Sequence, residues 1–234
     1  MIGEAQRASR TVDDLMELSS IEIGGELEIE RVRAVDAARE AVDRVAAHAA
    51  QRNINVEVVA TERIAETADL DTDRRRLVSA LVNIVENAIK YSPPSSDVRV
   101  AVDRIGEQPD RTVTISVADE GVGIPQRDLD RIFERFYRVD RARSRATGGT
   151  GLGLAIVRNT LHALGGSVEV TSVEGEGSTF TVSLPEASAR RPRAGGRDPS
   201  EERAAGVAAA GDGSGPDGRT SPSRSPRVQH EGAT

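Results

Sequence analysis

The sequence predicts an α+β fold, a two-layer α/β sandwich in which a mixed β-sheet is covered by helices on one side. Three observations support this prediction: short segments of alternating apolar residues, longer segments with helical apolar periodicity, and the order in which the two kinds follow one another. The composition suits a soluble globular core, because 37% of the 234 residues are hydrophobic and 29% are charged.

The N-terminal residues predict a helix that belongs to a bundle. Ala5, Ala8, Val12, Leu15 and Ser19 follow the three-then-four spacing of a helical seam, and the pattern ends near the glycines at 24 and 25. A helix of about five turns is marginally stable alone, so we expect it to pack against partners. Residues 1–23 are therefore predicted to be part of an incomplete helical bundle.

Residues 24–185 carry the patterns of the folded domain, and each element has its own signal. Period-two alternation marks the strands, 3.6-residue periodicity marks the helices, and Pro125 suits a first helical turn. The predicted elements are, in order, a strand at 26–32, helix 35–50, strand 54–60, a helix from Asp71 or Asp73 to Tyr91, strands 98–105 and 113–118, a short helix after Pro125, helix 152–164, and a hairpin of 167–173 and 179–184.

Beyond Pro185 the composition shifts to Ala, Gly, Ser, Pro and Arg with almost no large apolar residues. Such a segment cannot bury enough apolar surface to offset the entropy of ordering. We therefore expect residues 186–234 to form a disordered tail.

Charge and rare residues exclude several classes of function. The net charge of -7 argues against nucleic acid as the main partner. The chain has no cysteine, which excludes disulfides and thiolate metal sites, and its three histidines are too scattered to suggest a zinc cluster. No apolar run approaches the roughly 18 residues of a membrane span.

The predicted helix that ends at Tyr91 carries a narrow polar strip. Its apolar residues fill two flanks, and Asn83, Asn87 and Lys90, the only lysine of the chain, fall in the gap between them. The strip can face a ligand pocket, or it can be a solvated stripe of a core helix. The helix alone does not decide between these interpretations.

Two further segments have ligand-binding potential. Asp119 ends a strand and is followed by Gly121, Gly123 and Ile124, so a carboxylate acceptor could stand where backbone approaches a ligand closely, although an ordinary turn has the same pattern. The glycine-rich run from Gly149 to Gly153 leads into a helix, as in an anion site, but it could equally be a flexible linker and it matches neither a Walker A loop nor a dinucleotide fingerprint.

A ring-containing segment lies between these two glycine-rich runs. It contains Phe133, Phe136 and Tyr137 and continues into the arginine-rich residues 141–145. The rings can simply anchor a loop, or they can anchor a mobile lid that closes on phosphates.

Taken together, these segments resemble the ATP-binding domain of sensor histidine kinases, a member of the Bergerat-type class shared by gyrase, Hsp90 and MutL. Residues 83–91 look like the asparagine box of that family, residues 119–123 like the first glycine box, residues 133–136 like the phenylalanine box, and residues 149–153 like the second glycine box. Gly177-Ser178-Thr179-Phe180 is similar to the closing hairpin.

The resemblance implies an Mg²⁺-ATP site. It assigns Asn87 to Mg²⁺ with Asn83 beside it, Lys90 to phosphate oxygens and Tyr91 to the base. Asp119 would accept the adenine amine, with a water held by Ser178 or Thr179, and Arg138 would reach the γ-phosphate from the lid. Glu86 would either orient a metal-bound water or face solvent. The remaining expected nucleotide-binding residues are Gly121, Gly123, Ile124, Phe136, Gly149, Thr150, Gly151, Leu152 and Gly153.

Residues 12–22 are similar to the end of the second helix in the family's dimerisation and phosphoacceptor domain. The helix that carries the phosphorylated histidine is not in this sequence, and His48, His162 and His230 do not match its motif. The resemblance thus implies a histidine kinase domain that donates the γ-phosphoryl group to a histidine on another chain or an upstream segment, without phosphorylating itself.

The expected partners are that phosphoacceptor domain, the receiver domain of a response regulator and, for a full-length protein, a second copy of the chain. The expected location is the cytoplasm, with tethering to the membrane by upstream segments. Two alternatives remain open at this point: an anti-sigma-type serine kinase of the same fold, and a non-catalytic nucleotide-binding or interaction module. The alanine and arginine richness and residues 141–150 further resemble actinobacterial kinases of the phosphate-responsive kind.

Overall fold

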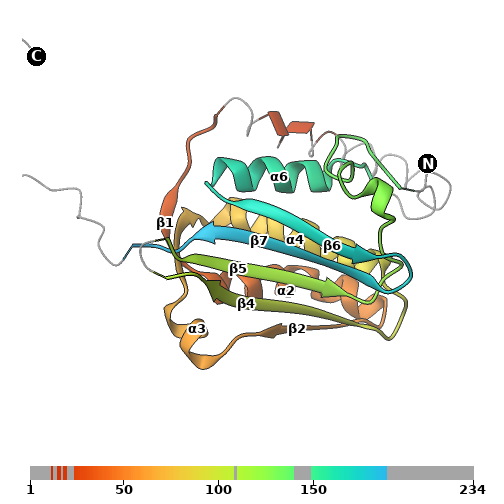
Figure 1. Cartoon of the computed structure of the whole chain (residues 1–234), viewed down its shortest axis with the longest axis horizontal. Helices are drawn as coiled ribbons and strands as arrows, with labels where there is room; N and C mark the ends of the chain where they lie inside the picture. The colour runs from red at the N-terminus through yellow and green to blue at the C-terminus, as the bar shows by residue number, and fades with distance from the viewer. Residues whose placement is uncertain are drawn as a thin grey trace, which may run out of the picture. The chain divides into compact units, whose positions relative to one another are not determined.

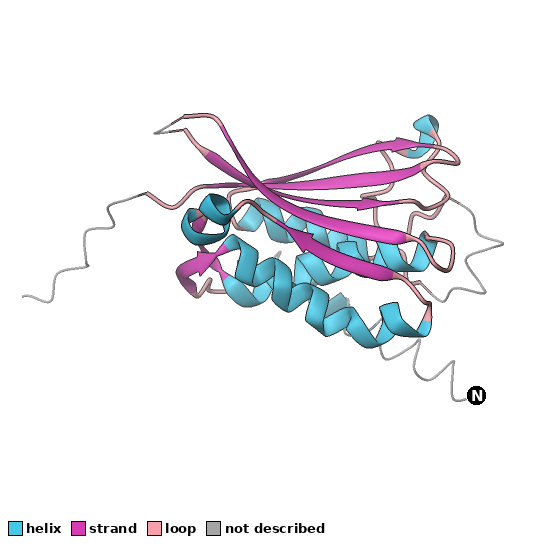
Figure 2. Cartoon of the chain, turned by 90° about the horizontal axis from the view of Figure 1, so that it is seen from below, coloured by secondary structure: helices cyan, strands magenta, loops and turns pink. Residues whose placement is uncertain are grey.

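A computed structural model describes residues 24–107, 110–139 and 149–188, together with residues 12, 15, 16, 18 and 19. Figure 2 shows two layers, with the strands of the large sheet in one and the long helices against a single face of it. The predicted two-layer sandwich is therefore confirmed. The predicted tail lies outside the described residues from position 189 onward.

Helices and strands alternate along the chain from β1 to β4, whereas β5 follows β4 directly and β7 follows β6 directly (Figure 1). The helices are α2 (Ala34–Gln51), α3 (Glu62–Thr67), α4 (Arg74–Tyr91) and α6 (Gly153–Ala163), with a 3₁₀ turn, η1 (Gln126–Asp128). The strands are β1 (Ile29–Arg33), β2 (Asn55–Val59), β3 (Asp69–Asp73), β4 (Asp97–Ile105), β5 (Thr112–Asp119), β6 (Ser167–Val173) and β7 (Gly177–Pro185).

The main sheet is mixed and has five strands in the order β2-β4-β5-β7-β6. β2 is parallel to β4, and the other neighbours are antiparallel. On the face that meets the helices, residues in register form apolar rows: Val117 lies opposite Val100 and Phe180, and Ile115 opposite Val102 and Val182. Successive strand residues point to opposite faces, so these rows account for the apolar alternation in the sequence.

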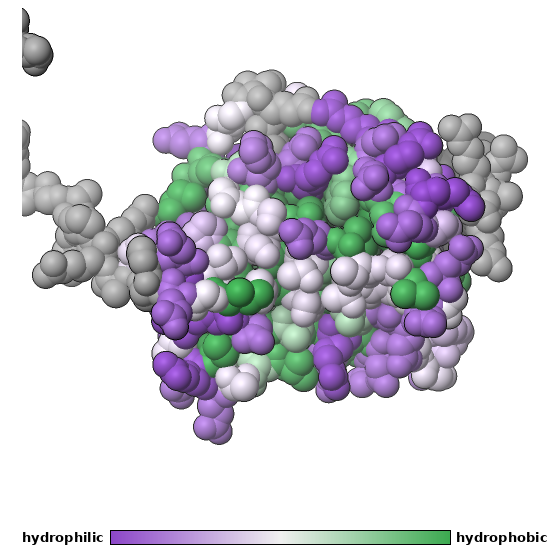
Figure 3. Space-filling model, viewed as in Figure 1, coloured by the Kyte–Doolittle hydropathy of each residue, from purple (hydrophilic) through white to green (hydrophobic). Residues whose placement is uncertain are grey.

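The other face of the sheet is open to solvent. Along β5 and β7 its residues are mainly small and polar: Thr112, Thr114, Ser116, Thr179, Thr181 and Ser183. Figure 3 shows this face as a mostly pale surface with charged groups around it.

α4 packs between α2 and α6 in the helical layer. Its N-cap is Asp73, whose side chain accepts a hydrogen bond from the Arg76 amide at 3.1 Å. Leu77, Leu81 and Ile84 are fully buried, as the predicted flanks require. The polar strip therefore belongs to a helix held on both sides, which fixes its direction.

Two elements were not predicted from the sequence. β3 consists of Asp-Leu-Asp-Thr-Asp, a composition poor in strand-forming residues, yet it pairs with β1 in a separate two-stranded antiparallel sheet. The short helix α3 lies between the predicted strand 54–60 and the predicted helix from Asp71 or Asp73, and it is capped by the Thr61 side chain. Tertiary pairing and capping here outweigh weak local preference.

The chain remains packed past the expected domain boundary at Pro185. The side chain of Glu186 is 6% exposed, and its two oxygens lie 2.6 Å from Arg104 and 3.3 Å from Arg111. The Ala187 amide donates to the carbonyl of Asp69. The last three described residues thus join β3 to the main sheet.

We expect Glu186→Ala to lower the free energy of unfolding by roughly 3 kcal/mol, because it leaves the guanidinium of Arg104, whose side chain is 11% exposed, without its closest partner. Urea denaturation would measure the loss. The matched control is Glu176→Ala, which removes an exposed carboxylate from the β6–β7 turn. Equal losses in the two variants would contradict the prediction.

The described residues of the N-terminal segment touch α6 through one side chain. Leu18 is 2% exposed and forms a small apolar cluster with Leu152 and Ile156. Two residues of the predicted seam, Val12 and Leu15, are instead exposed, so the predicted seam is not the surface that contacts α6. Ala5 and Ala8 of the same seam lie outside the described residues.

Within the described ranges, no helix is both long enough and apolar enough to cross a membrane.

Candidate nucleotide site

The candidate residues gather at one end of the sandwich, where four segments meet. These are the last turns of α4, the loop after β5, the start of β7, and the glycines that lead into α6. The segments are far apart in the sequence, and the antiparallel pairing of β5 with β7 brings Asp119 beside Ser178.

Asp119 begins a polar row where the inner apolar rows of the sheet end. It lies opposite Ser178 on β7, and Ser178 lies opposite Ser172 on β6. One oxygen of Asp119 accepts from the Gly121 amide at 2.8 Å. Burial raises the pKa of the Asp119 carboxyl, although hydrogen bonds from the amides of Gly121 and Ser178 oppose this effect. The row thus provides a partly buried acceptor.

The register decides which hydroxyl accompanies Asp119. Ser178 shares its row and is 8% exposed, whereas Thr179 pairs with Ala118 in the adjoining row, whose side chains face the open side of the sheet. Ser178, rather than Thr179, can therefore act together with the Asp119 carboxylate.

Ser172 belongs to this polar row, although the sequence alone does not predict it. Its Oγ accepts from the Ile124 amide at 2.8 Å, donates to the Gly177 carbonyl at 2.7 Å, and lies 3.0 Å from the Ser178 Oγ. A serine in an alternating strand has no distinctive signal, so only the pairing of β6 with β7 could reveal it.

The loop after Asp119 requires glycine because backbone passes close to it. A Cβ on Gly123, where φ is +66°, would overlap the carbonyl of Val173, and a Cβ on Gly121 would lie 2.9 Å from the carbonyl oxygen of Tyr91. The Val122 amide also donates to that Tyr91 carbonyl. The end of α4 and the loop after β5 are thereby held together.

The cationic part of the site lies at the end of α4. The Lys90 Nζ lies 4.9 Å from the ring centroid of Tyr91. It also lies close to the backbone of Gly149, because a Cβ added to that glycine would be 2.5 Å from the Lys90 Nζ. The same hypothetical Cβ would lie 3.9 Å from a guanidinium nitrogen of Arg138. Lys90 and Arg138 therefore approach the same glycine from two segments, as a phosphate-binding region requires.

The Asn83 carboxamide of α4 faces the start of α6. Asn83 donates to the carbonyl of Ser79 at 3.2 Å, and its Oδ1 would lie 3.0 Å from a Cβ on Gly153. Asn87 is half-buried one turn further on, whereas Glu86 is exposed. Since the strip contacts α6, the solvated-stripe interpretation of the sequence does not hold for Asn83.

The glycine run is connected to the ring-containing segment. The amide of Phe136, a residue with a φ of +61°, donates to the carbonyl of Gly151 at 2.8 Å, and the Phe136 side chain is 57% exposed. The Thr150 hydroxyl makes a hydrogen bond inside the glycine run, because it accepts from the Leu152 amide. Leu152 is fully buried in the cluster with Leu18, so only its backbone can serve the site.

Two contacts anchor the start of the expected lid. Phe133 packs edge-on against Phe180 of β7, with ring centroids 6.4 Å apart. The hydroxyl of Tyr137 donates to Asp128 at 2.6 Å, and this hydrogen bond raises the pKa of the Tyr137 hydroxyl. The arginine-rich residues 141–145 lie outside the described residues.

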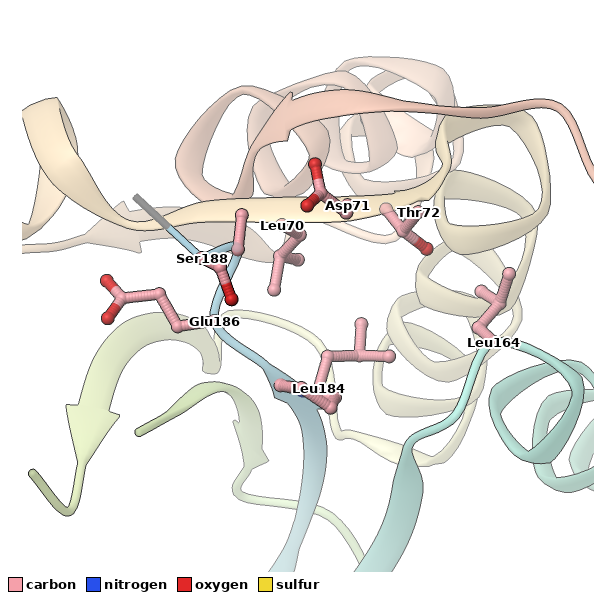
Figure 4. Close-up of a pocket in the computed structure, with 9 residues that line it drawn as sticks. Leu70, Asp71, Thr72, Leu164, Leu184, Glu186 and Ser188 are labelled. Carbon is pink, nitrogen blue, oxygen red and sulfur yellow. The ribbon is translucent and has the colours of Figure 1, made fainter. Parts of the chain in front are cut away.

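A hollow of about 190 Å³ lies away from these residues, at the opposite end of β7 (Figure 4). Leu70, Leu164 and Leu184 form its apolar lining, and Glu186 contributes to its polar side. Glu186 is engaged in ion pairs with Arg104 and Arg111. None of the expected nucleotide-binding residues lines this hollow.

Residues 72–188 match the family of histidine kinase-, DNA gyrase B- and HSP90-like ATPases, and the chain belongs to this family. The sensor-like histidine kinase SenX3 of Mycolicibacterium smegmatis is 41% identical over 193 residues, which are 80% of this chain and 47% of that protein. The chain thus spans about half the length of this curated relative.

Two solved structures share the fold. The mycobacterial sensor histidine kinase MprB aligns with a TM-score of 0.56 and 27% identity, over 68% of this chain and 97% of that one. Full-length ShkA in complex with AMPPNP aligns with a TM-score of 0.65 and 27% identity, over 81% of this chain and 38% of that one. The resemblance inferred from the sequence is confirmed at the level of the family.

Proposed function

We propose that this chain binds Mg²⁺-ATP and donates its γ-phosphoryl group to a histidine of a sensor-kinase phosphoacceptor domain. The observation that carries the proposal is the convergence on one end of the fold of an acceptor for the base, Asp119, and a cation beside a glycine run, Lys90. A nucleotide triphosphate offers both a donor amine and a chain of anionic oxygens, so it complements both ends of this arrangement.

Each remaining residue has a role in this proposal. Tyr91 lies against the base, Ile124 supports it, and the amides of residues 149–153 bind phosphate oxygens at the start of α6. Arg138 stabilises the charge that develops on the transferring phosphoryl group. Glu86, which is exposed, is assigned only to orienting water near the metal.

The α4 carboxamides fit Mg²⁺. Among the described residues no group of three or more His, Cys, Asp or Glu side chains could hold a metal ion. Asn87 offers a half-buried carboxamide oxygen with Asn83 one turn away, and Mg²⁺ accepts one or two hard protein oxygens when phosphates and waters complete its shell. Bound there, the ion would neutralise the negative charge of the phosphates.

The acceptor histidine is proposed to lie outside this chain. His162 is exposed on α6, and His48 is half-buried near the end of α2. Neither is on a bundle-type helix such as the one predicted for residues 2–20. We further propose a response-regulator receiver domain as the next phosphoryl acceptor, a homodimeric full-length protein, and a cytoplasmic site of action tethered through upstream segments.

A transfer assay tests the proposal. The purified chain is incubated with γ-labelled ATP, Mg²⁺ and a separate helical phosphoacceptor domain of a related sensor kinase. Label is expected on the acceptor, in an acid-labile histidine linkage, and not on the chain alone. An acid-stable product would favour the serine-kinase alternative, and ATP binding without any transfer would favour a non-catalytic module.

A further inference from the structure

Ser172 has a complete set of hydrogen bonds, and this set fixes the polarity of the neighbouring hydroxyl. A serine hydroxyl has one hydrogen to donate and two lone pairs to accept with. Ser172 uses its hydrogen on the Gly177 carbonyl at 2.7 Å and one lone pair on the Ile124 amide at 2.8 Å. In the remaining hydrogen bond, which joins the two hydroxyl oxygens at 3.0 Å, Ser172 must therefore be the acceptor.

It follows that Ser178 is the donor in the pair. Its only hydrogen points to Ser172, so its lone pairs are directed elsewhere. Ser178 sits directly opposite Asp119 in the register of β5 and β7, and its side chain is 8% exposed. The polar row Asp119–Ser178 thus presents acceptors only, a carboxylate and an oriented hydroxyl oxygen.

We propose that Ser172 is a positioning residue that determines base specificity: by holding the Ser178 hydroxyl as an acceptor, it makes the row select a purine with a 6-amino group over one with a 6-oxo group. This inference rests on the proposed nucleotide site. A 6-amino group can donate to both acceptors, directly or through a water. A 6-oxo group is itself an acceptor, so the lone pairs of the buried carboxylate and hydroxyl are left without a donor, which costs binding free energy.

Ser172 also links the specificity row to the loop that approaches the base. Its bond to the Ile124 amide joins β6 to the loop after β5, where a Cβ on Gly123 would overlap the carbonyl of Val173. Without the Ser172 hydroxyl, the Ser178 hydrogen is free to rotate and the Ile124 amide loses its acceptor. Loss of the Ser172 hydroxyl should therefore weaken the discrimination between bases and leave phosphate binding unchanged.

The test measures the ratio of the affinities for Mg²⁺-ATP and for Mg²⁺-inosine triphosphate, which carries a 6-oxo group in place of the 6-amino group of ATP and a hydrogen on the neighbouring N1. Ser172→Ala is expected to lower this affinity ratio about three- to tenfold, because the free energy of one or two hydrogen bonds to the base corresponds to a change of that size. Ser172→Thr, which keeps the hydroxyl, is expected to retain it. The matched control is Ser167→Ala, an exposed serine at the other end of β6.

A Ser172→Ala variant that binds both nucleotides more weakly by the same factor would overturn the inference, because a merely structural role predicts that result. Ser178→Ala, which removes the oriented acceptor itself, must also lower the ratio. An unchanged ratio in Ser178→Ala would overturn the inference even if Ser172→Ala did not fold. Failure of the wild-type chain to bind either nucleotide would instead refute the proposed function.

Discussion

Replacing Asp119 by asparagine is expected to weaken ATP binding about 100-fold, because it turns an acceptor for the adenine amine into a donor and leaves two donors facing each other. The substitution keeps the shape of the side chain and an oxygen for the amides of Gly121 and Ser178. Calorimetric titration with Mg²⁺-ATP measures the loss. The control is Asp103→Asn, an exposed carboxylate on β4 that should leave affinity unchanged.

The same substitution should not destabilise the fold. Burial raises the pKa of Asp119 above that of an unfolded chain, so the folded protein binds a proton more readily, and its stability falls as pH rises through the window between the two pKa values. Above this window the ionised side chain therefore costs stability, and the neutral carboxamide of the Asp119→Asn variant removes that cost. A thermal midpoint well below that of the wild type would show that Asp119 is a structural residue and would contradict this assignment.

Replacing Asn87 by alanine is expected to lower phosphoryl transfer about 100-fold, because a metal that neutralises phosphate charge contributes several kcal/mol and Asn87 is its proposed protein ligand. The effect should appear as a loss of metal dependence. In the wild type, ATP affinity should fall when Mg²⁺ is chelated, whereas in the variant it should be similar with and without Mg²⁺.

Asn55→Ala provides the control for this variant, since Asn55 is an exposed residue of the edge strand β2 and its side chain donates to Asp97 of β4. An Asn87→Ala variant that retained full Mg²⁺ dependence would refute the metal assignment. Asn83, one turn earlier and in contact with the start of α6, would then be the next ligand to test.

Much of the fold could be predicted because the signal was local. The buried flanks of α4, with Leu77, Leu81 and Ile84, follow a 3.6-residue period, and β5 places Val113, Ile115 and Val117 on the inner face by strict alternation. β3 could not be predicted, because its three aspartates disguise a strand that is stabilised by pairing with β1. Glu186 was assigned to the tail by composition, although two arginines far away in the sequence hold it.

In the candidate site, too, local patterns were predictable and contacts between distant segments were not. The separate segments that carry Asn83, Lys90, Asp119 and the glycine run were recognisable from the sequence. Their mutual contacts were not, because each depends on strand register or on loop backbone. The register alone selects Ser178 over Thr179 and adds Ser172 to the polar row, and a buried Leu152 shows that one residue of the second glycine box faces the core.

A crystal structure of the chain with Mg²⁺ and a non-hydrolysable ATP analogue tests the central claim most directly. We predict the adenine amine within hydrogen-bonding distance of Asp119, directly or through one water, the phosphates between Lys90 and residues 149–153, and the metal on Asn87. A nucleotide bound elsewhere, for example in the hollow beside Leu164 and Leu184, or one whose base does not approach Asp119, would contradict the account.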